Sequence, residues 1–369
     1  MKYGNIDMSY KVYLLNTFNK VNNMSDFYDG TKLLSLQDLN GKKPEIYMTT
    51  GNRSSGKTTW FSRYAVKQFK TKHKKFCLVY RWNYELSDCA DKFFKDIQRL
   101  FFPNDYMDEK RRANNIFVEL FLNDESCGYC ITLNNADSLK KFSHMLSDVD
   151  MMIFDEFQSE NNHYCPNEIK KLLSIHMSIA RGGGQQVRYV PLYMISNKVS
   201  LINPYFLSLG ISDRLREDTK FLKGDGFVLE QSYLSGVADK QLESGFNRAF
   251  ANEDYIAYAT QNVYLNDSSA FIEKPSGNST YLATIRNNDK DYAVRYYPKD
   301  GLYFMDKAVD DDFKIKLSFN AVSHEANYVM VGTTNAYAMM LKSAFERGLM
   351  RFKNQECKSA FFEMLKYTI

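Results

Sequence analysis

The segment that most constrains the fold of this chain is an eight-residue stretch, Gly51-Asn52-Arg53-Ser54-Ser55-Gly56-Lys57-Thr58. It fits the P-loop pattern, in which a glycine and any four residues precede Gly-Lys-Ser or Gly-Lys-Thr. Residues 46–50 before it are predicted to form a short buried strand, and the apolar residues after it recur at helical spacing across 60–69. The stretch is therefore predicted to join a strand to a helix in an α/β P-loop domain.

Nucleotide binding requires this layout. The backbone N–H groups of such a loop and the positive end of the helix converge on phosphates, and Gly51 and Gly56 allow a tight, inward-facing backbone. Lys57 is expected to reach the β- and γ-phosphates, and the Thr58 hydroxyl is expected to ligate Mg²⁺. The predicted cofactors are ATP and Mg²⁺. The predicted ATP-binding residues are Gly51, Asn52, Arg53, Ser54, Ser55, Gly56, Lys57, Thr58 and Thr59.

A second motif follows at residues 149–156, where an apolar run ends in Asp155 and Glu156. This is the Walker B arrangement. Asp155 is expected to hold Mg²⁺ through water, so that Thr58 and Asp155 form the predicted metal site. Glu156 is expected to orient and deprotonate the attacking water. The adjacent glutamate favours a nucleotide hydrolase over a P-loop kinase, because a kinase does not use an activated water.

Two further polar residues each have two interpretations. Residues 190–195 are predicted to form another buried strand, which ends at Ser196 and Asn197. Asn197 is either a sensor of the γ-phosphate or the attacking water, or part of an ordinary turn. Arg181 precedes three glycines at 182–184. That composition is typical of an arginine finger that reaches a neighbouring subunit, and equally of a flexible surface loop.

Length and composition set wider limits. A chain of 369 residues is expected to contain more than one domain. The net charge of +4 suits a nucleic-acid partner only where basic residues are clustered, or multiplied around a ring of subunits. No apolar run resembles a signal peptide or a membrane span, so a cytosolic protein without a membrane partner is predicted.

The sequence divides into three segments. An N-terminal P-loop domain is predicted over 1–206, and residues 207–266 are predicted to be a lid or linker of short helices and charged turns. From 267 to 369 the chain changes to short strands followed by two helices, at 334–350 and 356–367. This pattern predicts a smaller α+β domain built on an antiparallel meander.

Several stretches between residues 46 and 355 together resemble one protein family. Besides the P-loop they are Phe154-Asp155-Glu156-Phe157, Ser196-Asn197, Asn203-Pro204-Tyr205-Phe206-Leu207, Phe271-Ile272-Glu273-Lys274, Ser343-Ala344-Phe345 and Arg351-Phe352. They resemble viral DNA-packaging ATPases of the large-terminase group, and most closely the DNA encapsidation ATPases of small short-tailed bacteriophages. The P-loop and Asp-Glu motifs are common to many ATPases, so the stretches at 203–207 and 271–274 narrow the choice.

The resemblance implies a motor that hydrolyses ATP to move double-stranded DNA into a procapsid. It implies a homomeric ring of five subunits, docked at the portal vertex in the host cytoplasm. In the family an arginine from the neighbouring subunit completes the site, and Arg181 lies where it is expected. Lys140 or Lys141 is the candidate for a second residue that acts across the interface. The implied order of the parallel strands is 5-1-4-3-2, the additional-strand (ASCE) type.

The resemblance also implies an RNase H-like fold for the C-terminal domain. An active nuclease needs several carboxylates that converge on two metal ions. The first long strand, 280–286, carries no acid, whereas Asp306 ends a later strand and 310–312 are aspartates in a loop. We therefore expect a nuclease-like domain that does not cleave DNA and instead docks to the portal or to a packaging RNA.

Three alternatives remain open from the sequence. Instead of a packaging motor without nuclease activity, the chain could be a terminase whose nuclease is active. It could also be another ring or helicase-type ATPase that acts on RNA or single strands, or a nucleotide-binding assembly factor.

Overall fold

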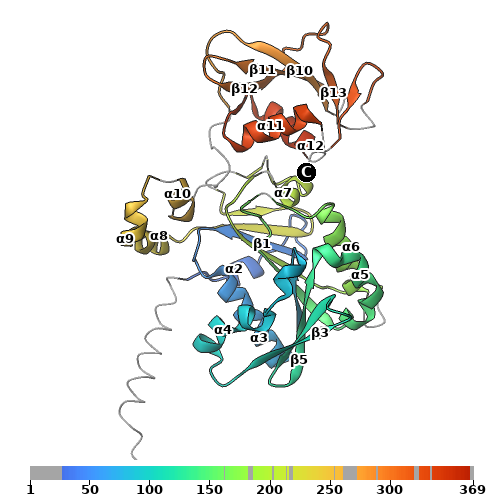
Figure 1. Ribbon diagram of the computed structural model, residues 1–369, viewed down its shortest axis with the longest axis vertical. Coiled ribbons are helices and arrows are strands. Elements are labelled where there is room, and N and C mark those ends of the chain that lie inside the picture. The colour runs from blue at the N-terminus through green and yellow to red at the C-terminus, as the bar shows by residue number, and fades with distance from the viewer. Residues whose placement is uncertain are drawn as a thin grey trace, which may run out of the picture.

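The computed structural model describes residues 27–365 except 162, 182–185, 202, 213, 216–218, 253, 261–271, 288–289, 320–323 and 333–334. The glycines after Arg181, and Phe271 of the 271–274 stretch, therefore lie outside the described residues. Two sheets, one of nine strands and one of six, organise the chain (Figure 1). No helix among the described residues combines the length and the apolar character that crossing a bilayer requires.

The N-terminal sheet has the strand order β3-β4-β5-β2-β6-β7-β1-β9-β8. Its strands are β1 (Ile46–Gly51), β2 (Lys75–Tyr80), β3 (Met107–Arg112), β4 (Phe117–Leu122), β5 (Glu125–Thr132), β6 (Val149–Asp155), β7 (Leu192–Asn197), β8 (Phe221–Lys223) and β9 (Phe227–Ser232). Six strands, β5, β2, β6, β7, β1 and β9, are parallel neighbours. From β9 to β2 their order, counted along the chain without β5, is 5-1-4-3-2, as predicted, and β5 extends the parallel run beyond β2.

The last parallel strand along the chain is β9, which lies in the segment that the sequence interpretation assigned to a lid or linker at 207–266. That part of the interpretation is wrong for 221–232, because β9 pairs with β1 along its whole length. β9 also packs on both faces, with all six of its residues buried. Its polar residues Glu230, Gln231 and Ser232 concealed it, since a buried parallel strand is normally a continuous apolar run.

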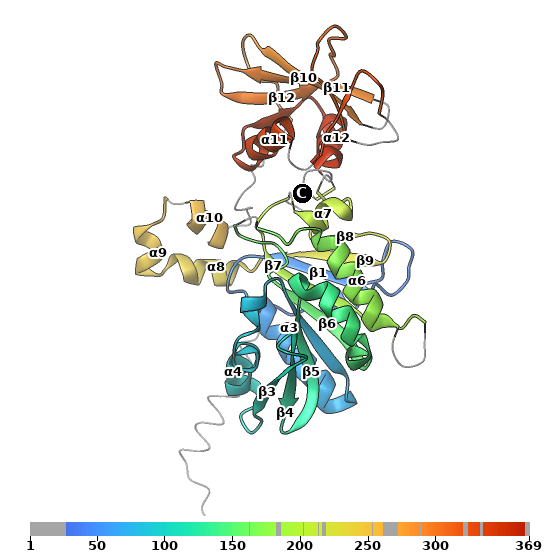
Figure 2. The ribbon, with the colours of Figure 1, turned by 45° about the vertical axis from the view of Figure 1, so that its right-hand side comes forward.

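Helices cover both faces of this sheet, which explains the uninterrupted apolar runs of its central strands. On one face α3 (Lys57–Lys72) and α4 (Cys89–Phe101) pack in one core cluster. On the other face α6 (Glu168–Ala180) packs with the short helix α5 (Ala136–Leu139) in a second cluster. Figures 1 and 2 show these two layers with the sheet between them.

Three short helices follow β9: α8 (Ser235–Leu242), α9 (Gly245–Ala249) and α10 (Asp254–Thr260). They form a small group that projects to one side of the sheet in Figures 1 and 2. This described part of the predicted lid segment has the short-helix character that the sequence suggested.

The C-terminal sheet is mixed, with the order β14-β13-β10-β11-β12-β15. Its elements are β10 (Thr280–Asn287), β11 (Lys290–Tyr297), β12 (Leu302–Asp306), β13 (Lys316–Ser318), β14 (Val329–Met330), α11 (Ala336–Glu346), β15 (Met350–Phe352) and α12 (Gln355–Leu365). The antiparallel meander predicted for this region is present as β10–β12. The flanking strands β13 and β15 pair in parallel with β10 and β12, so the sheet as a whole is not antiparallel.

The two parts of the chain meet at α7 (Pro204–Ser208). Asn203 caps this helix by accepting a hydrogen bond from the Phe206 N–H at 3.0 Å, and Pro204 occupies its first turn. α7 contacts α12, and Leu207 packs in the core of the C-terminal domain. Figures 1 and 2 both show α11 and α12 between the C-terminal sheet and α7.

Candidate nucleotide-binding site

The P-loop joins β1 to α3, as predicted from the sequence. Gly56 caps α3 with φ 86° and ψ 14°, the left-handed conformation that glycine adopts without steric cost. Ser54, two residues earlier, also has a positive φ of 59°. The loop therefore turns back on itself ahead of the helix, and the free N–H groups of the first turn of α3 face the space that it encloses.

Gly51 is required for a different reason from the one predicted. A Cβ atom at this position would lie 1.9 Å from the carbonyl oxygen of Ser232 on β9. The glycine thus permits the close approach of two paired strands. Gly51 is not one of the residues with a positive φ. The sequence pattern identified the residue correctly but not the neighbour that requires it.

Lys57 is buried at the base of the loop, with 5% of its surface exposed. Its ammonium donates to the Asn52 carbonyl at 2.8 Å and the Ser55 hydroxyl at 3.0 Å, and lies 3.5 Å from Asn197 Oδ1. All three are neutral oxygens. Burial lowers the pKa of Lys57 from its usual 10.5 to about 8, although the charge of Asp155 opposes the shift. A buried cation surrounded by neutral acceptors is a site that an anion such as a phosphate fits.

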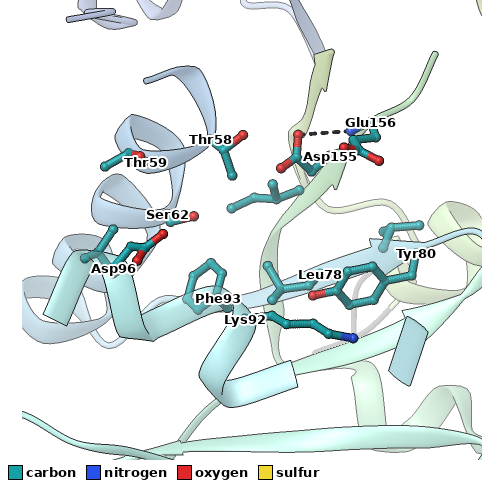
Figure 3. A pocket seen from close by; sticks show the side chains of 13 residues that line it. Thr58, Thr59, Ser62, Leu78, Tyr80, Lys92, Phe93, Asp96, Asp155 and Glu156 are labelled. Carbon is teal, nitrogen blue, oxygen red and sulfur yellow. Dashed lines mark hydrogen bonds between the residues drawn. The ribbon is translucent and has the colours of Figure 1, made fainter. Parts of the chain in front are cut away.

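Thr58, Asp155 and Glu156 lie beside one another at the carboxyl ends of β6 and β1. Figure 3 shows them at a cavity of about 340 Å³, whose opposite wall is formed by Lys92, Phe93 and Asp96 of α4. The side chains of Thr58 and Asp155 line the same cavity, and Asp155 Oδ1 accepts from the Glu156 N–H at 2.9 Å. A hydroxyl and a carboxylate at one cavity are oxygen ligands of the kind that Mg²⁺ takes.

The pKa values of Asp155 and Glu156 are both raised. Burial raises the pKa of Asp155, and its hydrogen bonds and Lys57 only partly offset this. Burial also raises the pKa of Glu156, and the negative charges of Asp155 and Glu160 add to the effect. A carboxylate whose pKa is raised is a stronger base, which suits proton abstraction from water.

Asn197 is the last residue of β7 and pairs in register with Gly51. Its side-chain oxygen lies 3.5 Å from the Lys57 ammonium. The structure thus brings Asn197 into the site, as one of the two sequence interpretations expected.

Arg53 and Asn52 make contacts that the motif did not predict. The Arg53 guanidinium is paired with Glu160 at 2.6 Å and is hydrogen-bonded to Tyr255 of α10. The Asn52 side chain exchanges hydrogen bonds of 3.2 Å with both backbone groups of Leu234, where the chain leaves β9. The loop is therefore joined to β9 and to the α8–α10 group by its own side chains.

The structure does not bring Arg181 to the P-loop of its own chain. Arg181 ends α6, where the Ala180 carbonyl accepts from the Arg188 N–H at 2.8 Å and His176 contacts the Val190 carbonyl. This end lies beside the amino end of β7, whereas the P-loop lies at the carboxyl end of the neighbouring strand β1. A strand of this length separates the two ends by roughly 17 Å. A role for Arg181 at a P-loop therefore requires a second copy of the chain.

Lys140 and Lys141 are likewise distant from their own P-loop. They follow β5 and α5, and β5 is four strand positions from β1, or about 19 Å. Lys140 is paired with Asp137 at 3.0 Å, and Lys141 is exposed.

Sequence reasoning missed a buried ion pair beside the site, between Arg81 and Glu168. One signal for it was available. Arg81 directly follows the apolar run of β2, and polar residues at the carboxyl ends of parallel strands lie at the ligand-binding edge of such sheets. Glu168 had no comparable signal, because an acid in the first turn of a helix is ordinary.

The domain is thus an α/β domain with a largely parallel sheet, a glycine-rich loop that leads to a buried lysine, and an acidic pair at the carboxyl end of β6. The chain belongs to the podovirus DNA encapsidation protein (Gp16) family, whose model matches residues 22–369.

Similar proteins span nearly the whole chain. The DNA packaging protein of Bacillus phage phi29 is 26% identical over 344 residues, covering 92% of this chain and 97% of that protein. The DNA packaging protein of Bacillus phage B103 is 27% identical over 322 residues, covering 86% and 95%. Two solved structures share the fold. A chain of the bacteriophage Phi-29 viral genome packaging motor assembly has a TM-score of 0.56 at 24% identity, covering 93% of this chain and 100% of that one. The Phi-28 gp11 DNA packaging motor has a TM-score of 0.57 at 18% identity, covering 93% and 97%.

The lowered pKa of Lys57 predicts proton uptake when nucleotide binds. Without an anion, the side chain loses its proton as the pH passes about 8, and a bound triphosphate raises its pKa again. Binding of ATP at pH 9 is therefore expected to take up on the order of one proton, and binding at pH 7 none at this residue. Calorimetry in two buffers of different ionisation enthalpy measures the uptake.

The control is Lys57→Met, which should abolish the uptake at pH 9. The lowered pKa of Lys57 also makes the stability of the ligand-free fold depend on pH. Between pH 8 and 10.5 the unfolded chain binds more protons at Lys57 than the folded chain does. The free energy of unfolding is therefore expected to rise with pH across this range. Wild-type binding at pH 9 without proton uptake would contradict the assignment.

Proposed function

We propose that this chain is the ATPase of a phage DNA-packaging motor, which hydrolyses ATP with Mg²⁺ and moves double-stranded DNA into a procapsid. The observation that carries the proposal is the arrangement of Lys57, Asp155 and Glu156 in a chain that belongs to the podovirus encapsidation family. The buried ammonium supplies the anion site, and the acidic pair lies next to it at the end of β6.

Each residue has a defined role in the proposed reaction. The N–H groups of residues 51–59 and the Lys57 ammonium hold the phosphates of ATP. Thr58 and Asp155 hold Mg²⁺, which when bound neutralises charge on the β- and γ-phosphates. Glu156 accepts the proton of the attacking water. Asn197, whose side-chain oxygen lies 3.5 Å from the Lys57 ammonium, acts as the sensor of the γ-phosphate or of the attacking water.

We propose further that the active form is a homomeric ring of five subunits. The number five comes from the resemblance to packaging ATPases alone. A site shared between subunits is supported by the position of Arg181, which is exposed at the far end of α6 and out of reach of its own P-loop. Arg181 then serves as the arginine finger of a neighbouring subunit's site. Lys140 or Lys141 is the second candidate for a contact across the interface.

Family membership supports the partners and the location that we propose. The ring docks at the portal of the procapsid, in the host cytoplasm, and a packaging RNA is a further candidate partner. Helicase-type action on single strands is the alternative that remains for the ATPase domain.

For the C-terminal domain we propose an RNase H-like fold that docks and does not cleave. The mixed sheet, with an antiparallel meander flanked by parallel strands, supports the fold. Asp306 accepts from the Ala308 N–H at 2.9 Å and lies 3.7 Å from the Arg295 guanidinium, so its carboxylate already has partners. Within the described part of the chain, no three His, Cys, Asp or Glu side chains gather as a metal site.

The first test is Glu156→Gln. The variant is expected to bind ATP as the wild type does but to lose about 10²–10⁴-fold in hydrolysis rate, because the amide cannot accept the proton. Hydrolysis by the wild type is expected to be stimulated more by duplex than by single-stranded DNA. Asp108→Asn, the same chemical change on the exposed edge strand β3, is the matched control. Full hydrolysis by Glu156→Gln would refute the proposed role, and stronger stimulation by single strands would favour the helicase alternative.

A mixing experiment tests Arg181. Arg181→Ala and Lys57→Ala subunits are each expected to be inactive in assembled motors, with losses of roughly 10³-fold or more. Mixed together they should regain activity, since the intact arginine of one subunit completes the intact P-loop of the other. The control replaces Lys57→Ala with the double variant Lys57→Ala/Arg181→Ala, which supplies no arginine. Equal activity in both mixtures would show that Arg181 does not act in a neighbour's site.

The docking role of the C-terminal domain predicts no nuclease activity. Supercoiled plasmid incubated with the full chain and Mn²⁺ is expected to stay uncut, with Asp306→Ala indistinguishable from the wild type. Nicking by the wild type that Asp306→Ala abolishes would instead establish an active terminase nuclease.

A further inference from the structure

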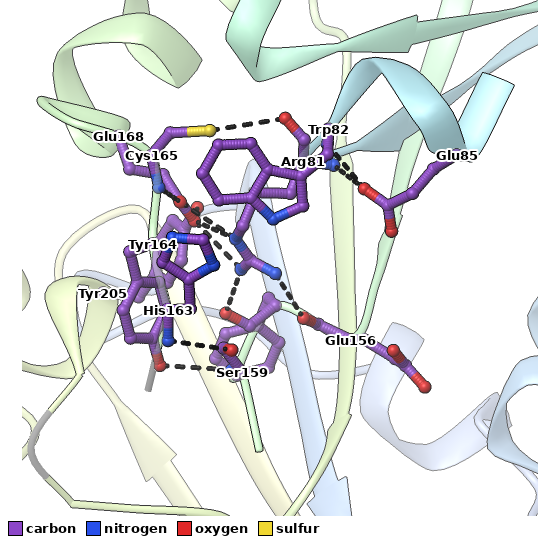
Figure 4. A network of polar contacts seen from close by, with 11 residues as sticks. Arg81, Trp82, Glu85, Glu156, Ser159, His163, Tyr164, Cys165, Glu168 and Tyr205 are labelled. Atoms are coloured by element: carbon purple, nitrogen blue, oxygen red, sulfur yellow. Dashed lines mark hydrogen bonds and ion pairs between the residues drawn. The ribbon is translucent and has the colours of Figure 1, made fainter. Parts of the chain in front are cut away.

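A buried polar network lies directly behind Glu156, and none of the roles above uses it. Its centre is Arg81, which follows β2 and has 6% of its surface exposed. The Arg81 guanidinium is paired with both oxygens of Glu168, at 2.9 Å and 3.1 Å from Nε and at 3.0 Å from Nη2. Figure 4 shows this network between the end of β2, the start of α6 and α7.

The remaining donors of Arg81 hold the backbone of the Walker B turn. Nη2 donates to the Phe157 carbonyl at 2.9 Å, and Nη1 donates to the Glu156 carbonyl at 3.3 Å. The carboxyl group of Glu156 points away from the guanidinium (Figure 4), so Arg81 contacts the peptide and not the proposed base itself.

The backbone at Glu156 needs such support. Its φ is 54°, in the left-handed region that residues with a side chain seldom adopt. A conformation of this kind persists only where the surrounding structure holds it. On its other side the Phe157 N–H donates to the Ile195 carbonyl of β7 at 3.2 Å. The turn that aims the Glu156 carboxylate is thus fixed by β7 and by Arg81.

Glu168, which holds Arg81, is itself fixed by two further groups. Glu168 Oε1 accepts from the Tyr205 hydroxyl at 2.6 Å, and Oε2 accepts from the Cys165 N–H at 2.7 Å. Burial and the charge of Glu168 raise the pKa of Tyr205 well above its usual value, so its hydroxyl stays a donor. Tyr205 belongs to α7, which contacts α12 and whose Leu207 packs in the C-terminal core.

We propose that Arg81 is a positioning residue for ATP hydrolysis: by binding the carbonyls of Glu156 and Phe157, it holds the Glu156 carboxylate in the orientation that activates water. Glu168 and Tyr205 hold Arg81 in turn. Because Tyr205 lies on α7, the seating of the C-terminal domain bears on this orientation. The inference rests on the proposed role of Glu156.

The test is Arg81→Lys in the full chain, which keeps the charge but removes the planar fork that reaches two carbonyls and a carboxylate together. The expected result is a fall in kcat of roughly 10–100-fold, with the KM for ATP changed by less than about threefold, because misplacing a catalytic group slows chemistry without removing the phosphate contacts. Tyr205→Phe should lower kcat in the same direction by a smaller factor. Arg112→Lys, which alters the Arg112–Glu119 pair on the distant strands β3 and β4, is the matched control.

Each single variant is also combined with Glu156→Gln. If Arg81 acts through Glu156, Arg81→Lys costs little further rate in that background, whereas a general structural defect would lower the rate by the same factor again. The inference is overturned if Arg81→Lys lowers the rate by the same factor in the Glu156→Gln background as it does alone. It is also overturned if folded Arg81→Lys has a kcat within about twofold of wild type. Where Arg81→Lys fails to fold, wild-type kcat in Tyr205→Phe overturns it. If Glu156→Gln alone leaves kcat intact, it is the proposed function that fails.

Discussion

The site depends on one electrostatic constraint, the burial of the Lys57 ammonium among neutral oxygens at the end of β1. An ion removed from water is stabilised only by partners close to it, and neutral acceptors do this less well than an anion. The lowered pKa of Lys57 is the measure of that deficit. The preference for phosphate that we propose for this site therefore arises from the folded conformation of the loop.

The parallel sheet is what lets several strands contribute to this one place. β1, β6 and β7 run in the same direction, so their carboxyl ends bring Lys57, Asp155 and Asn197 together although the three are far apart in sequence. β2 adds Arg81 at the same edge, and β9 closes the other side against Gly51. The same edge carries the connections to α7 and to the α8–α10 group. Hydrogen bonds thus join both α7 and the α8–α10 group to residues around the P-loop.

Much of the fold could be predicted from the sequence because local patterns carried it. The P-loop with its flanking strand and helix, the Walker B strand and the three-strand meander of the C-terminal domain were all predicted near their observed bounds. β9 was missed because its buried residues are half polar, and their partners are supplied by distant segments, as Tyr28 is for Glu230 at 2.8 Å. The parallel pairing of β13 and β15 was missed because strand direction leaves no local pattern.

The sequence by itself determined which residues we propose for the chemistry of the site, since the identities and spacing of Lys57, Thr58, Asp155 and Glu156 form local motifs. Only the tertiary structure decided which groups support them. Arg81, Glu168 and Tyr205 come from three separate segments, and nothing in their immediate neighbours marks them as a network. The reason is that a hydrogen bond between residues distant in sequence depends on how the layers pack. A P-loop motif, in contrast, consists of consecutive residues and can be recognised without the fold.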